Sequence, residues 1–122
     1  MVTVTPVNKK AEDERGSTHF FNTDRTGEFI IAYRKKGSVN AQHYHKGTAV
    51  TKNPEQFILM QGSITLNWFD VRNKDIKGSL KIVAPSMVEI KPWAWHEAIA
   101  DTDFVMFELN GLEDAKEDTF RI

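Results

Sequence analysis

Short apolar stretches separated by polar turns recur along the chain, and no long segment has the three-to-four-residue apolar spacing of an amphipathic helix. The stretches are rich in β-branched and aromatic residues and follow one another at the spacing typical of an all-β sandwich or barrel. Strands are predicted at residues 28–36, 56–60, 64–69, 79–83, 87–91, 95–100 and 103–109, with a further strand at 2–7.

The connections between these strands are read from turn residues and charge. Gln61-Gly62-Ser63 is a turn signal, so the strands on either side of it are predicted to form a β-hairpin. The polar stretch 70–78 is predicted to be an exposed hairpin loop, and the charge-dense stretch 8–16 a loop. The tail at 111–122 fits either a short helical turn or an added strand.

Several predicted strands are apolar on both faces. If Glu55 points into a cavity, Phe57 follows it inward and Ile58 must point outward, and the same problem recurs at 103–109. A second subunit would cover such outward apolar side chains, so a homodimer is predicted. The alternative is that a second sheet or the strand at 2–7 covers them within one chain.

Composition narrows the class of protein. The 122 residues (14.0 kDa) fit one domain, and the net charge of −1 gives no reason to expect a nucleic-acid partner. There are no cysteines, which removes disulfides and thiolate chemistry. No stretch approaches 18 apolar residues and no apolar signal region opens the chain, so neither a membrane span nor a secretory signal is expected, and a cytoplasmic location is predicted.

Histidines supply the candidate chemistry. His43 and His45 alternate on a predicted strand, which would direct both imidazoles to one face with Cα atoms roughly 7 Å apart. Glu55 and His96 would complete a four-ligand set suited to a first-row transition metal. His19 stands alone in an expected early strand, where a solvated or core role is predicted instead.

The spacing of these residues resembles a known motif. Gly37, five residues, His43-Tyr44-His45, a spacer, Glu55, six residues and Gly62 resemble the first motif of the cupin superfamily, G-x5-H-x-H-x3,4-E-x6-G. The spacer is nine residues long instead of three or four, and its polar, Gly- and Pro-containing sequence at 46–54 predicts a longer loop at a cavity mouth.

The second cupin motif, G-x5-P-x-G-x2-H-x3-N, is matched less well. His96 stands at its histidine and Pro92 resembles the turn before it, but Trp93 replaces a glycine and Ala100 replaces the final asparagine.

The resemblance implies an all-β, cupin-type jelly-roll or double-stranded β-helix barrel. Its core would occupy about 28–109 of a single domain at 1–122, with an N-terminal arm and a C-terminal tail. It also implies one divalent metal, bound by the residues matching His43, His45, Glu55 and His96. Three neutral imidazoles and one carboxylate leave such a site with a net charge near +1 and, at octahedral coordination, two open positions. Iron, manganese, nickel, copper and zinc all suit this ligand set.

Other residues are candidates for binding and proton transfer. Glu108 shares its strand face with Phe104 and Met106, so it is a candidate acid or base whose pKa burial would raise. The alternative is a surface residue at the strand end, or one that pairs with Arg34 or Lys81. Substrate-binding candidates are Tyr33, Trp93 and Trp95. The alternative for both tryptophans is packing over the barrel end or at a dimer contact.

Three functions remain open on the sequence. The first is a metal-dependent enzyme that isomerises, epimerises or hydrolyses a small polar substrate of carbohydrate type. The second is a non-catalytic protein that binds a metal or a small ligand. The third is an Fe(II)-dependent dioxygenase. All three take a small molecule as partner, and the family name alone does not choose among them.

Overall fold

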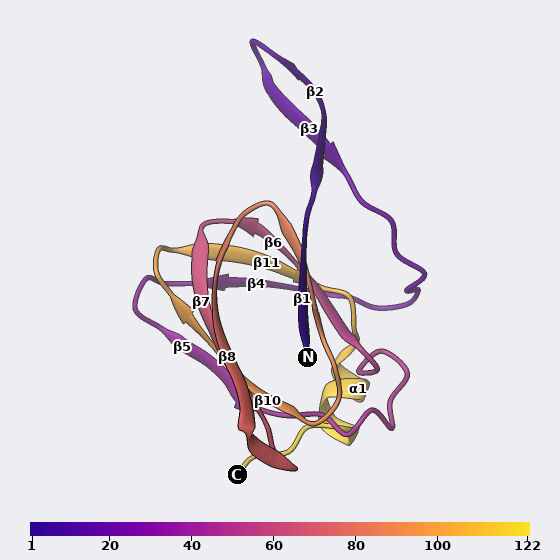
Figure 1. Ribbon diagram of the computed structural model, residues 1–122. Coiled ribbons are helices and arrows are strands. Elements are labelled where there is room, and N and C mark those ends of the chain that lie inside the picture. The colour runs from indigo at the N-terminus through magenta and orange to yellow at the C-terminus, as the bar shows by residue number, and fades with distance from the viewer.

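Two antiparallel sheets face each other in the computed structural model, which describes residues 1–122 (Figure 1). The five-stranded sheet has the order β1-β9-β6-β11-β4 and the four-stranded sheet the order β5-β10-β7-β8. The strands are β1 (Val2–Pro6), β2 (Asn8–Asp13), β3 (Gly16–Phe20), β4 (Ile30–Arg34), β5 (Val39–His43), β6 (Glu55–Gln61), β7 (Ser63–Asp70), β8 (Asn73–Val83), β9 (Ser86–Ile90), β10 (Ala94–Ala100) and β11 (Phe104–Glu108), and the helix is α1 (Leu112–Glu117). The all-β prediction is confirmed.

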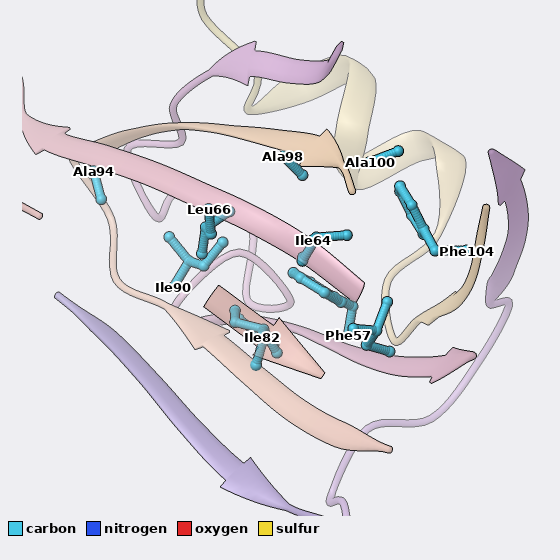
Figure 2. Close-up of a cluster of buried hydrophobic side chains, with 11 residues drawn as sticks. Phe57, Ile64, Leu66, Ile82, Ile90, Ala94, Ala98, Ala100 and Phe104 are labelled. Atoms are coloured by element: carbon cyan, nitrogen blue, oxygen red, sulfur yellow. The ribbon is translucent and has the colours of Figure 1, made fainter. Parts of the chain in front are cut away.

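The core fills the space between the two sheets. Side chains that alternate along each strand point inward from both sheets, as Figure 2 shows. The core cluster consists of Phe57, Leu59, Ile64, Leu66, Ile82, Val88, Ile90, Ala94, Ala98, Ala100 and Phe104. The period-two pattern thus predicts correctly that Glu55 and Phe57 of β6 point inward.

The predicted hairpin across Gly62 is wrong. β6 and β7 lie in different sheets, and the chain turns a corner at Gly62 instead of folding β6 back onto β7. Gly62 has φ +88°, and a Cβ there would collide with the backbone carbonyl oxygen of Asp103. A turn signal is local, so it marks the corner without telling which strand pairs with which.

Two predicted loops are also strands. The β7–β8 hairpin turns at Val71-Arg72, and β8 continues through the polar stretch that was expected to be a loop. β8 is an edge strand with mostly exposed residues, so a polar sequence suits it. The stretch 8–16 forms most of the β2–β3 hairpin, whose strand residues are all exposed and which projects from the body (Figure 1). Neither stretch has an inward face, so neither shows apolar alternation.

Of the two alternatives for the C-terminal tail, a short helical turn or an added strand, the structure shows the helical turn. α1 spans six residues, and beyond it Phe120 exchanges backbone hydrogen bonds with Tyr44, at 2.9 Å in each direction. No helix in the structure has the length and apolar character needed to cross a membrane.

Part of the outer face of the five-stranded sheet is covered within the chain. Ile58 points outward but is only 3% exposed. The segment before β4 contributes to this cover, because the Phe29 and Phe107 rings meet edge to face at 5.6 Å and the Thr23 hydroxyl hydrogen-bonds Gln56. β1 pairs with the edge of β9. Met60 nevertheless remains 48% exposed, so the homodimer stays a prediction.

Candidate metal centre and cavity

The structure brings the four predicted ligands together. His43 ends β5, His45 follows two residues later, Glu55 begins β6 and His96 lies in β10, where it pairs in register with His43. One ligand atom from each residue lies within 4.8 Å of all the others. His45, Glu55 and His96 are each 5% exposed or less, so the set is held inside the fold.

The backbone before His43 departs from a regular strand. Ala41 and Gln42 have φ values of +70° and +57°, in the left-handed region that non-glycine residues seldom adopt. The pairing of β5 with β10 shifts register at the same place, so Gln42 is an extra residue, as in a β-bulge. Arg121 donates hydrogen bonds to the carbonyls of Ala41 (2.8 Å) and Gln42 (3.3 Å) and so helps to hold this conformation.

Backbone carbonyls orient two of the imidazoles through the ring nitrogen that faces away from Glu55. His45 Nδ1 lies 2.6 Å from the Asp118 backbone carbonyl, and His96 Nδ1 lies 2.9 Å from the Ala94 carbonyl. A carbonyl only accepts, so each Nδ1 must carry the proton, and each Nε2 of a neutral ring presents a lone pair. Metal-binding histidines are commonly held by such a contact.

Both lone pairs point at one carboxylate oxygen. Glu55 Oε2 lies 2.7 Å from His45 Nε2 and 3.4 Å from His96 Nε2. Three electron-rich atoms this close repel one another unless a cation lies among them, either a metal ion or a proton on an imidazole. The four residues therefore fit a divalent metal.

The protonation states of the cluster also suit a metal. Burial, together with the neighbouring His96 and His45, lowers the pKa of His43 to about 3, although Glu55 opposes this, so its imidazole is neutral at neutral pH. Burial raises the pKa of the Glu55 carboxyl, but contacts with His45 and His96 and the charge of Lys52 hold it well below its ordinary value. Three neutral imidazoles and one carboxylate are the forms that ligate.

Lys52 is a residue of the site that the sequence did not reveal. The nine-residue spacer folds back so that Lys52 pairs with Glu55 through an isolated β-bridge. Its side chain is 3% exposed, and its Nζ lies 3.6 Å from Glu55 Oε1. A lysine in a polar loop carries no local signal of burial. The Lys52 ammonium thus places a positive charge beside Glu55, in addition to that of any bound metal.

Asp118 is a second residue that the sequence did not reveal. Its carboxylate accepts hydrogen bonds from the backbone amides of Lys46 (2.8 Å), Gly47 (2.9 Å) and Ala49 (3.1 Å). Burial raises the pKa of Asp118, but these amides lower it to below the usual value. Asp118 thus orders the start of the spacer loop with its side chain while its carbonyl orients His45.

A cavity of about 190 Å³ opens beside the cluster. Its lining includes His43, Glu55 and His96 and, further from the cluster, Arg34 and Glu108. Burial and the charge of Glu55 raise the pKa of Glu108, while Lys52 and Arg34 oppose that rise. Glu108 lines the cavity together with Met106, so it lies on the strand face that alternation predicted.

The aromatic candidates do not line this cavity. Trp93 lies in the turn before β10 and stacks on Tyr44, with ring centroids 6.0 Å apart. Trp95 stacks on Phe69 at 4.9 Å, and Tyr33 is 73% exposed. These placements agree with the packing alternative for the tryptophans. His19, in β3, is exposed and hydrogen-bonds only the Ser17 hydroxyl through its ring.

Comparison with known proteins identifies the fold. No family model and no curated protein sequence matches the chain. Among solved structures it is similar to a sugar 3,4-ketoisomerase from Thermoanaerobacterium thermosaccharolyticum in complex with TDP, with a TM-score of 0.73 and 16% identity over 99% of this chain and 88% of the other. It is also similar to dTDP-4-dehydrorhamnose 3,5-epimerase from Sulfolobus tokodaii, with a TM-score of 0.77 and 15% identity over 99% and 76%. A third is a 3,4-ketoisomerase from Helicobacter canadensis, with a TM-score of 0.71 and 19% identity over 99% and 90%.

These likenesses establish the class of fold. The neighbours belong to the cupin superfamily, and this chain has their jelly-roll fold. The predicted cupin fold is confirmed.

Proposed function

We propose that this protein is a divalent-metal-dependent cupin enzyme that isomerises or epimerises a small carbohydrate-type substrate. The observation that carries the proposal is the convergence of two Nε2 lone pairs and one carboxylate oxygen, with His43 as fourth member, at the wall of an open cavity. The sugar isomerases and epimerases among the structural neighbours support the reaction class.

His43, His45, Glu55 and His96 would hold the metal. A bound divalent metal supplies a Lewis acid that polarises a carbonyl or hydroxyl oxygen. Isomerisation and epimerisation also need a group that takes a proton from the carbon beside a carbonyl and returns one. Glu108 suits that role, because it lines the same cavity and burial raises its pKa above the ordinary value of a carboxyl.

One observation favours a second candidate, a metal-independent enzyme of the same reaction class. Lys52 already supplies a buried positive charge 3.6 Å from Glu55. With a proton on one of the imidazoles, Glu55 would be neutralised without any metal. The cluster would then act as a set of proton donors and acceptors.

Metal content separates the two candidates. The protein is expected to retain about one equivalent of a transition metal after dialysis, and His45→Ala to lose it. His19→Ala is the matched control, since His19 lies on the projecting hairpin away from the cluster. Equal metal content in the wild type and His45→Ala contradicts the proposed ligands. Reaction class is tested by incubating the protein with neutral aldoses and with sugar acids in D₂O and following deuterium incorporation beside the carbonyl by NMR.

We further propose that the protein forms a homodimer through its outer apolar surface. Ile31 is 55% exposed and Met60 48% exposed on the five-stranded sheet. Light scattering during size exclusion is expected to give about twice the chain mass, and Met60→Lys to shift the protein towards a monomer. A monomeric wild type contradicts this proposal.

A further inference from the structure

The five arginines divide into two groups. Three have a carboxylate partner within the salt-bridge distance: Arg15 with Asp13 at 2.8 Å, Arg25 with Asp24 at 3.6 Å, and Arg72 with Asp70 at 3.2 Å. Arg34 and Arg121 have none, and both line the cavity beside the metal cluster. The two arginines with no carboxylate within salt-bridge distance are thus the two that line the cavity of the candidate active site.

Arg34 is held in place through its neighbours. Its Nε donates to Asn40 Oδ1 at 2.9 Å and its Nη1 to the Tyr33 carbonyl at 3.1 Å. The Asn40 amide in turn donates to the Ser38 hydroxyl at 3.0 Å. Nη2 of Arg34 has no protein partner, so the guanidinium is oriented but keeps free N–H donors.

Arg121 reaches the cavity from the C-terminal tail. Its Nη1 donates to the carbonyls of Ala41 and Gln42, while its Nε and Nη2 have no protein partner. Nε and Nη2 form one edge of the guanidinium fork, which matches the two oxygens of a carboxylate. Both arginines are exposed, so they stand where the cavity meets solvent.

We propose that the substrate is a small organic acid, such as a sugar acid, whose carboxylate is bound by Arg34 and Arg121 while its hydroxyl or carbonyl oxygens face the His43–His96 side of the cavity. This inference rests on the proposed function, which it narrows to an acidic substrate. The positive charge of a bound divalent ion and two guanidinium groups exceeds the negative charge of the Glu55 and Glu108 carboxylates. The cavity therefore favours an anionic substrate.

The size of the cavity favours a small acid over a nucleotide-linked sugar. Its volume of about 190 Å³ is below the roughly 300–1,000 Å³ of pockets that enclose a drug-sized ligand. A nucleoside diphosphate sugar is several times larger and would have to lie mostly outside. A short hydroxy acid, or most of a sugar acid, fits between the arginines and the cluster.

Calorimetric titration of the full chain tests the inference. D-glucuronate and glycerate are titrated into the Zn²⁺-reconstituted protein and into EDTA-treated protein, with D-glucose and glycerol as neutral counterparts. The acids are expected to bind, and Arg34→Gln and Arg121→Gln each to weaken binding by about tenfold or more. Arg15→Gln, on the projecting hairpin, is the matched control and is expected to bind the acids as the wild type does.

Each outcome decides one claim. Equal binding of acid and neutral sugar, or undiminished acid binding in Arg34→Gln with Zn²⁺ content unchanged, overturns the acidic substrate. The acidic substrate is also overturned if inorganic phosphate or TDP binds more tightly than both acids and this binding is lost in Arg34→Gln and Arg121→Gln. The two arginines would then be assigned to phosphate binding. Arginine-dependent acid binding by a wild type that retains no Zn²⁺ supports the anion site and contradicts the metal proposal.

Discussion

His45 and Asp118 stand 73 positions apart in the chain, yet the His45 Nδ1 lies 2.6 Å from the Asp118 backbone carbonyl oxygen. Because a carbonyl oxygen only accepts, Nδ1 of His45 carries the proton in this contact, and Nε2 points towards Glu55. The end of α1 therefore orients a candidate metal ligand that the spacer loop alone would not hold.

Replacement of Asp118 by Ala is expected to lower both stability and metal affinity. The amides of Lys46, Gly47 and Ala49 lose a charged acceptor, which costs about 1.5–3 kcal/mol of unfolding free energy. Alanine keeps the backbone carbonyl that orients His45, so metal affinity is expected to fall only through displacement of that carbonyl, by less than the about 10- to 100-fold that is typical when an orienting contact is removed. Urea unfolding and chelator competition measure the two effects. Asp13→Ala, on the exposed hairpin, is the control, and equal behaviour of the two variants argues against this role for Asp118.

Stability of the metal-free protein is expected to fall as the pH is lowered below about 6.5. The folded-state pKa of His43 is about 3, against 6.5 for an unperturbed histidine, so between these values the unfolded chain binds more protons than the native chain. The contribution is complete above pH 6.5, decreases as the pH falls towards 3, and amounts to roughly 5 kcal/mol. Urea unfolding from pH 7 to 4 checks this. His43→Gln should flatten the slope, whereas His19→Gln should leave it unchanged.

Replacement of Lys52 by Met distinguishes the two candidate functions. If a metal binds at Glu55, the positive charge of Lys52, 3.6 Å from this ligand, repels the metal ion. Its removal is then expected to raise metal affinity by about tenfold. If Lys52 is the counter-ion instead, Glu55 is left buried with less compensation and the protein is destabilised without gaining a metal. Chelator competition and thermal unfolding are read together. Lys81→Met, at an exposed pair with Asp101, is the control.

Glu108→Gln is expected to reduce isomerase or epimerase turnover by about 100-fold or more while metal content is unchanged. Gln has nearly the shape of Glu but cannot exchange a proton at neutral pH. Deuterium incorporation and metal analysis on the same preparation check this. Full turnover in this variant would remove Glu108 from the reaction.

Gly62→Ala is expected to destabilise the fold more than Gly27→Ala. Both glycines have positive φ, at +88° and +107°, so both substitutions carry a similar backbone cost of about 1 kcal/mol. Only at Gly62 does a Cβ also meet the Asp103 carbonyl, whereas at Gly27 nothing lies within 4 Å. Denaturant midpoints that are equal in the two variants contradict the tight corner between β6 and β7.

The sequence by itself determined the class of fold, the inward face of β6 and the four residues of the candidate metal cluster. Strand periodicity and ligand spacing are local properties, so they can be read without knowing which strands pair. Glu55 and Phe57 point inward because alternate residues of a strand share a face, and this remains true in either sheet.

Only the tertiary structure decided what surrounds that cluster. Strand pairing separated β6 from β7. β2 and the polar first half of β8 (73–78) became strands without an apolar signal, because their residues are almost all exposed. The burial of Lys52, the contact of Asp118 with His45 and the absence of an ionic partner for Arg34 all depend on residues distant in the chain. Charge and orientation at the site are set by such non-local neighbours, which sequence spacing does not contain.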